Sequence, residues 1–132
     1  MMHEGGCRCG ELRYRIEGEP VHHAVCHCRD CQLAHAAPMV AWLAVSSDKF
    51  ALTHGSPSSF ESDSGSVRHF CKQCGTPLHF VNEAMLPGLV DIPSATLDTP
   101  AAFAPSVQIQ TAERREWVCL LSEMPKFERY PG

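Results

Sequence analysis

Three tight cysteine clusters constrain the fold of this 132-residue chain more than any other feature of its sequence. Seven of its eight cysteines lie in these clusters, which are the pair Cys7 and Cys9, the triplet Cys26, Cys28 and Cys31, and the pair Cys71 and Cys74. Thiolates bind zinc at about 2.3 Å in a tetrahedron, so the sulfurs of one site lie within about 4 Å of one another. Two cysteines in one turn meet that demand, and two such turns from distant parts of the chain close a site.

A disulfide framework is the other common use of eight cysteines, and it belongs mainly to short secreted chains. The N-terminal residues 1–7 (MMHEGGC) contain no apolar signal core, so we expect no export, a cytoplasmic location and reduced thiols. Zinc is therefore the preferred interpretation of both cysteine pairs. Cys71-x-x-Cys74 followed by Gly75 is a strong half-site, and Cys7-x-Cys9 followed by Gly10 gains its weight from that partner.

The number of clustered thiols predicts two metal sites of different kinds. The two pairs make one closed site with a formal charge of +2 − 4 = −2, and the triplet makes a second site with +2 − 3 = −1 and a free fourth position. Closed sites are structural, whereas three protein ligands with an open position are typical of catalytic zinc. A small thiol is a natural fourth ligand, because zinc favours the thiolate at neutral pH. The triplet could instead assist a structural site or stay as free thiols.

Composition excludes several other classes of function. Hydrophobic residues make up 44 % and charged residues 20 % of the chain, as in an ordinary globular domain, and we expect one domain over residues 1–132. The formal charge of −4 argues against binding to nucleic acid or to an anionic membrane surface. The cysteine spacing does not match a ββα zinc finger, and no apolar run approaches the ~20 residues of a membrane span.

Alternating apolar residues and frequent turns predict a mainly β fold with at most short helices. A short helix is expected over residues 30–36, with Asp30 as its N-cap and Pro38 beyond its end. Residues 117–121 are ambiguous between strand and helix, and Cys119 there is expected to be a small core residue. The expected strands are residues 11–17, 21–25, 39–45, 49–53, 58–61, 67–70, 78–81, 89–92 and 107–110.

Few other side chains stand out as functional candidates. His27 lies inside the triplet and is the best histidine candidate, with His35 and His69 behind it. Arg68 could anchor an anionic substrate, but pairing with a carboxylate is the preferred interpretation. The remaining histidines are expected to be structural or exposed, and the two tryptophans to be core residues: His3, His22, His23, His54, His79, Trp42 and Trp117.

These motifs resemble those of the glutathione-dependent formaldehyde-activating enzymes, the GFA or S-(hydroxymethyl)glutathione synthase-like family. The resemblance covers essentially the whole chain. It rests on GCRCG at residues 6–10, CHCRDCQ at 26–32, RHFCKQCGTPL at 68–78, TLDTP at 96–100, and Trp117 followed by MPKF at 124–127.

The resemblance implies a β-tent fold, in which strands surround zinc. It also implies that Cys7, Cys9, Cys71 and Cys74 hold a structural zinc and that Cys26, Cys28 and Cys31 hold a catalytic one. The activity implied is the condensation of glutathione with formaldehyde to S-hydroxymethylglutathione, a carbon–sulfur lyase reaction when written in reverse. His27 or a bound water is the candidate proton donor.

The chain departs from the family pattern at Ala36 and Ala95, where many members have glycine, and at Gln108, where a histidine is frequent. None of these changes removes a thiolate, but they leave the substrate pocket open to question. Some members of the family also have no established reaction. A non-catalytic, zinc-stabilised binding module is therefore the second hypothesis, and the sequence predicts no oligomeric state.

Overall fold

The computed structural model describes all 132 residues, and its regular elements are mostly short strands. None of the helices has the length and hydropathy that a membrane span requires. In chain order the elements are β1 (Met2–Gly6), β2 (Arg13–Glu17), β3 (His22–Cys26), α1 (Arg29–His35), β4 (Val40–Ser46), η1 (Ser47–Lys49), β5 (Phe50–His54), β6 (Ser58–Glu61), β7 (Val67–Phe70), β8 (Pro77–Val81), β9 (Leu89–Pro93), η2 (Ser94–Thr96), η3 (Pro100–Ala102), β10 (Val107–Ile109), η4 (Thr111–Glu113) and η5 (Glu116–Glu123), where η marks a 3-10 helix.

The strands form two sheets, which confirms the predicted mainly β fold. The larger sheet has seven strands in the order β10-β3-β4-β9-β8-β7-β6, and the smaller has the order β1-β2-β5. All pairings are antiparallel except that of β10 with β3, which is parallel. Strand β1 was not predicted from the sequence, because its residues MHEGG lack apolar alternation.

The main hydrophobic core joins the two sheets, and β4 has a buried side chain on both of its faces. On one face Leu43 and Val45 pack with residues of β2, β8 and β9, and both Cys7 and Cys71 belong to this cluster. Side chains alternate along a strand, so Val40 and Trp42 point to the opposite face. There they form a second cluster with Cys26 and Cys31. Each cysteine cluster is thus built against a different face of the large sheet.

Helix α1 begins and ends one residue earlier than predicted and has a different N-cap. It begins at Arg29, and the Cys28 sulfur accepts the Cys31 N–H at 3.3 Å, so Cys28 is the N-cap and Asp30 lies in the first turn. The helix packs on β4 through an edge-on contact between His35 and Trp42, whose ring centroids are 5.1 Å apart. It therefore presents two cysteines of the triplet to the face of the sheet that carries the third.

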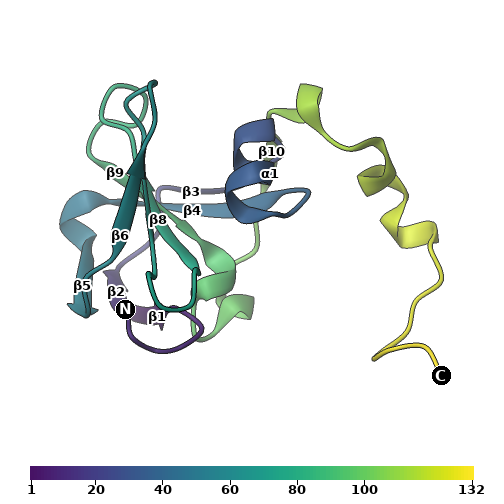
Figure 1. Ribbon diagram of the computed structural model, residues 1–132, viewed down its shortest axis with the longest axis horizontal. Coiled ribbons are helices and arrows are strands. Elements are labelled where there is room, and N and C mark those ends of the chain that lie inside the picture. Colours follow the sequence, from purple (N-terminus) through teal and green to yellow (C-terminus); the bar gives the residue numbers. More distant parts are fainter.

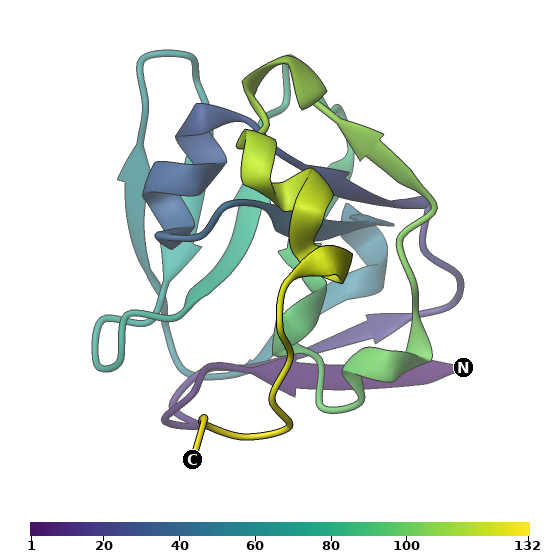
Figure 2. The same cartoon turned by 90° about the vertical axis from the view of Figure 1, so that its right-hand side faces the viewer.

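The C-terminal segment leaves the body of the molecule after η4, as Figure 1 shows; in Figure 2 it projects toward the viewer and is drawn in front of the body. Its last anchor is Glu113, whose carboxylate accepts the Arg29 N–H at 2.9 Å. Residues 117–121 lie in the 3-10 helix η5. The predictions that Trp117 and Cys119 are core residues are wrong, because both side chains are exposed. Trp117 only lines a surface cavity beside Arg29 and Leu33 of α1.

Candidate metal centres

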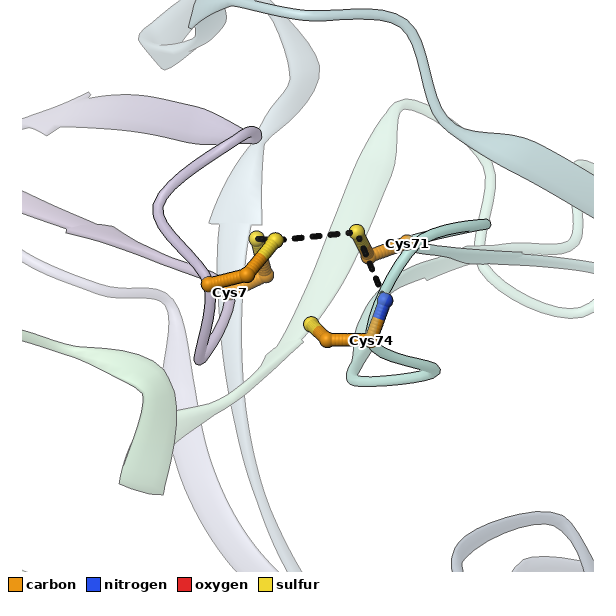
Figure 3. Close-up of side chains that lie close together, drawn as sticks. Cys7, Cys71 and Cys74 are labelled. Atoms are coloured by element: carbon orange, nitrogen blue, oxygen red, sulfur yellow. Dashed lines mark hydrogen bonds between the residues drawn. The ribbon is translucent and has the colours of Figure 1, made fainter.

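Four cysteines from two loops meet at one cluster, called here the closed cluster: Cys7, Cys9, Cys71 and Cys74. Their sulfurs all lie within 4.8 Å of one another, and Figure 3 shows Cys7, Cys71 and Cys74 pointing toward a common centre. The Cys7 and Cys9 sulfurs are 3.6 Å apart and those of Cys9 and Cys71 are 3.7 Å apart. These separations are far longer than the ~2 Å of a disulfide and match the edges of a zinc tetrahedron.

Backbone donors and glycines shape the closed cluster. The Leu12 N–H donates to the Cys7 sulfur at 3.2 Å, and the Cys74 N–H donates to the Cys71 sulfur at 3.5 Å. Gly75 follows with φ of +80°, a value that favours glycine and lets the turn around the sulfurs close. Such N–H donors share the negative charge of bound thiolates.

The second cluster, called here the triplet, consists of Cys26, Cys28 and Cys31. Cys26 ends β3, Cys28 caps helix α1 and Cys31 lies in its first turn. Their sulfurs also lie within 4.8 Å of one another, with those of Cys26 and Cys31 3.8 Å apart. No fourth histidine, aspartate or glutamate ligand belongs to this group, so the triplet offers three donors.

The ionisation of the triplet thiols fits a site that holds a cation. The hydrogen bond between Cys26 and Cys31 lowers the pKa of Cys31 to about 5 and raises the pKa of Cys26. The thiols on their own therefore share negative charge unequally. A zinc ion allows all three to ionise, so the donor set fits that metal. The closed cluster and the triplet are thus two groups of thiols that could each hold a metal ion.

Only the triplet opens into a cavity. A cavity of about 240 Å³ is lined by all three triplet cysteines, and no cavity in the structure is lined by any cysteine of the closed cluster. The walls also include apolar side chains of Trp42 and Phe80. Its volume lies just below the usual range of small-molecule sites, about 300–1,000 Å³.

Arg68 lies at the triplet, although the sequence favoured only a structural pairing. Its guanidinium does pair with the Asp30 carboxylate at 2.7 Å, which confirms that pairing. It also stands 3.8 Å from the Cys31 sulfur and over the Phe80 ring at 4.9 Å. The guanidinium thus adds positive charge beside the triplet and lines the cavity.

The histidine candidates lie away from the cavity that the triplet lines. His27 is fully buried, and its Nε2 lies 2.8 Å from the side-chain oxygen of Gln108. Gln108 is the position at which the family pattern frequently has a histidine. His35 packs on Trp42, and His69 stacks on His79 with ring centroids 4.0 Å apart. Of the histidines, only His22 lines the cavity.

Two cavity residues with an unpaired buried polar atom were not predicted from the sequence. Asp91 and Asn82 both line it, and both are at least nine-tenths buried, with exposed fractions of 8 % and 2 %. The signal for Asp91 was a single carboxylate in the middle of the apolar strand LVDIP at residues 89–93. A charged residue at such a position is rarely buried without a partner or a function.

Comparison with known proteins places these features in a family. The family model described as glutathione-dependent formaldehyde-activating enzyme matches residues 2–113. The crystal structure of a Rhodobacter sphaeroides protein superposes with a TM-score of 0.65 at 16 % identity, covering 80 % of this chain and 98 % of that one. That likeness shows a shared fold.

A curated relative from Schizosaccharomyces pombe, named as an uncharacterized lyase, is 28 % identical over 78 residues. The match covers 59 % of this chain and 56 % of the relative, so the chain spans just over half the length of that protein.

Proposed function

This chain belongs to the family of glutathione-dependent formaldehyde-activating enzymes, and from that premise we propose that it is a zinc-dependent carbon–sulfur lyase or synthase. Its substrate would be the adduct of glutathione, or of another small thiol, with formaldehyde or a related aldehyde. The name of the fission-yeast relative is consistent with a lyase. Cys26, Cys28 and Cys31 would form the catalytic centre, and the closed cluster would hold a structural zinc.

One observation carries this proposal: the three-thiol cluster lines a cavity, and the four-thiol cluster does not. A metal held by four thiolates has no free position, whereas a metal held by three can accept a ligand from the cavity. The two clusters therefore have the donor numbers and surroundings expected of one structural and one catalytic site.

Zinc bound at the triplet would supply a positive charge that favours the thiolate form of an incoming thiol. Residues of the protein would supply the other contributions. The walls of Trp42 and Phe80 exclude water around the reacting sulfur, and Arg68 offsets the negative charge of the cysteines. In the synthetic direction a sulfur–carbon bond forms, the carbon–oxygen π bond breaks, and the oxygen takes up a proton to become the hydroxyl.

Exchange NMR tests the proposal directly. The rate of exchange between free glutathione and its formaldehyde adduct is measured with and without the zinc-loaded protein. We expect acceleration by the wild type and by Cys119→Ser, which alters an exposed thiol outside both clusters. Cys28→Ser should return the rate to the uncatalysed value, because it removes one of three triplet ligands.

The alternative, a non-catalytic binding module, gives a different result. The protein would then hold one zinc tightly and leave the exchange rate unchanged at any zinc loading. Acceleration that survives Cys28→Ser would also contradict the assignment of the triplet.

A further inference from the structure

We propose that Asp91 and Asn82 form an oxygen-binding subsite in the triplet cavity, where they bind the hydroxyl or carbonyl oxygen of the adduct and Asp91 exchanges a proton with it. The inference rests on the proposed function, since it assigns the oxygen end of the same substrate. It also answers which group supplies the proton, because His27 is occupied by Gln108 and does not line the cavity.

The strand pairing aims Asp91 at the cavity. Its neighbours Val90 and Ile92 both belong to the main core, so alternation turns Asp91 to the opposite face of the sheet. That is the face of Trp42, because Asp91 pairs with Ala44, two residues further along β4. On the other side Asp91 pairs with Phe80 of β8. Asp91 thus sits in the floor of the cavity, between a small alanine and an aromatic wall.

Asn82 lies just after β8, two residues beyond Phe80, and lines the same cavity. Hydrogen bonds from the backbone fix the orientation of its side-chain amide. Its Oδ1 accepts the N–H groups of Ala84 and Met85 at 3.2 and 3.1 Å. The amide is therefore held with Nδ2 as the remaining donor, and this buried Nδ2 has no partner. Asn82 lines the cavity, and its Nδ2 is therefore an unpaired donor in the cavity wall.

The Asp91 carboxylate is unsatisfied in the same cavity. Its buried Oδ1 has no hydrogen-bond partner. A buried polar group without a partner lowers stability, so a donor and an acceptor left unpaired in one cavity indicate a ligand that bonds to both. A hydroxyl group fits, because it donates to the carboxylate and accepts from the amide. Asp91 does not belong to the group of metal-ligand atoms, so its carboxylate is not committed to a metal.

The proton transfer balances in both directions. In cleavage, the hydroxyl proton of the adduct passes to the Asp91 carboxylate, the carbon–oxygen double bond forms, the carbon–sulfur bond breaks, and its electron pair stays on sulfur. In synthesis, the protonated Asp91 returns the proton to the oxygen as sulfur attacks the carbonyl carbon. Burial raises the pKa of Asp91 to about 6, close to the pH at which such exchange is efficient. The other ionisable groups of the wall are His22, Asp30, Arg68 and the three thiols.

A matched pair of stable ligands tests the subsite by binding alone. S-(2-hydroxyethyl)glutathione carries a hydroxyl where S-propylglutathione carries a methyl group, and both affinities are measured by calorimetry on the zinc-loaded protein. We expect the wild type to prefer the hydroxyl ligand at least about tenfold, as for a buried bonded hydroxyl. Asp91→Asn should reduce the preference to less than about threefold and leave the affinity for the propyl ligand unchanged.

The control is Asp48→Asn, which changes an exposed carboxylate outside the cavity and should behave as the wild type. Asp91→Asn should also slow adduct exchange by about 10²–10⁴-fold, the usual contribution of a general acid or base. An unchanged hydroxyl preference in Asp91→Asn, with zinc content intact, would overturn the proposal. If the wild type fails to accelerate exchange but shows an Asp91-dependent preference, the proposed reaction is wrong and the oxygen-binding subsite stands.

Discussion

Removing one thiol from each cluster should separate a structural from a catalytic site. Cys74→Ser alters the closed cluster, which links two loops more than sixty residues apart in sequence and has two of its cysteines, Cys7 and Cys71, in the main core. Apart from sulfur contacts, the Arg8 N–H bonds to the Thr76 hydroxyl at 3.1 Å between these loops, worth about 1 kcal/mol.

The magnitude follows from the role of a structural metal. Structural zinc supplies about 10–16 kcal/mol of apparent binding free energy, which is coupled to folding. The total stability of a domain is about 5–15 kcal/mol. Losing even half of the zinc contribution is comparable with that total. Cys74→Ser should therefore abolish the cooperative unfolding transition at ordinary temperatures.

Cys28→Ser should leave the domain folded. The Cys28 sulfur accepts the Cys31 N–H at 3.3 Å as the N-cap of α1, and a serine hydroxyl makes the same capping bond. We expect a loss below about 1 kcal/mol from the helix, or about 4 °C in Tm, in addition to any stabilisation that metal at the triplet supplies. One zinc per chain should remain.

Thermal denaturation by circular dichroism and zinc analysis per chain check both variants, with Cys119→Ser as the control because that thiol is exposed and outside both clusters. Equal collapse of Cys28→Ser and Cys74→Ser, or a folded Cys74→Ser domain with wild-type Tm, would refute the division of roles.

Three further outcomes are expected. Folding raises the pKa of Asp91 from 3.8 to about 6, so the folded state favours the protonated carboxyl. The free energy of unfolding of the wild type should therefore fall by up to roughly 3 kcal/mol as pH increases through that window. In urea denaturation in a Cys28→Ser background, Asp91→Asn should be more stable than the same protein with Asp91 at pH 7 and equally stable near pH 4. Gly55→Ala should cost about 2–4 kcal/mol, because φ is +82° and the added Cβ would lie 2.2 Å from the Glu11 carbonyl oxygen, whereas Gly10→Ala, with φ of +84° and nothing within 4 Å, should cost about 1 kcal/mol in the same assay. A weak chelator should remove one zinc per chain without loss of structure, and a strong one should remove the second and unfold the protein; simultaneous release, followed by zinc analysis and circular dichroism, would argue against two kinds of site.

The boundaries of the regular elements show how far local patterns reach. The apolar run at residues 39–45 and the alternation at 12–16 predicted β4 and β2, because a half-buried or buried strand leaves its period in the sequence. Strand β1 left no such period, and its place comes from pairing with β2. The apolar segment around Trp117 and Cys119 resembled a core element and is exposed, since an apolar pattern shows a need for a partner surface and does not show that one exists.

The residues of the candidate sites divide in the same way. Spacing alone grouped the seven thiols correctly, because the small radius of a metal tetrahedron requires its ligands to come from tight turns that are visible in the sequence. The sequence by itself thus determined the two donor sets and the mainly β class. Only the tertiary structure decided which donor set faces a cavity and that Asp91, Asn82 and Arg68 share it. Those three residues come from β9, from the loop after β8 and from β7. Their convergence depends on strand register and packing across the sheet, which no local pattern encodes.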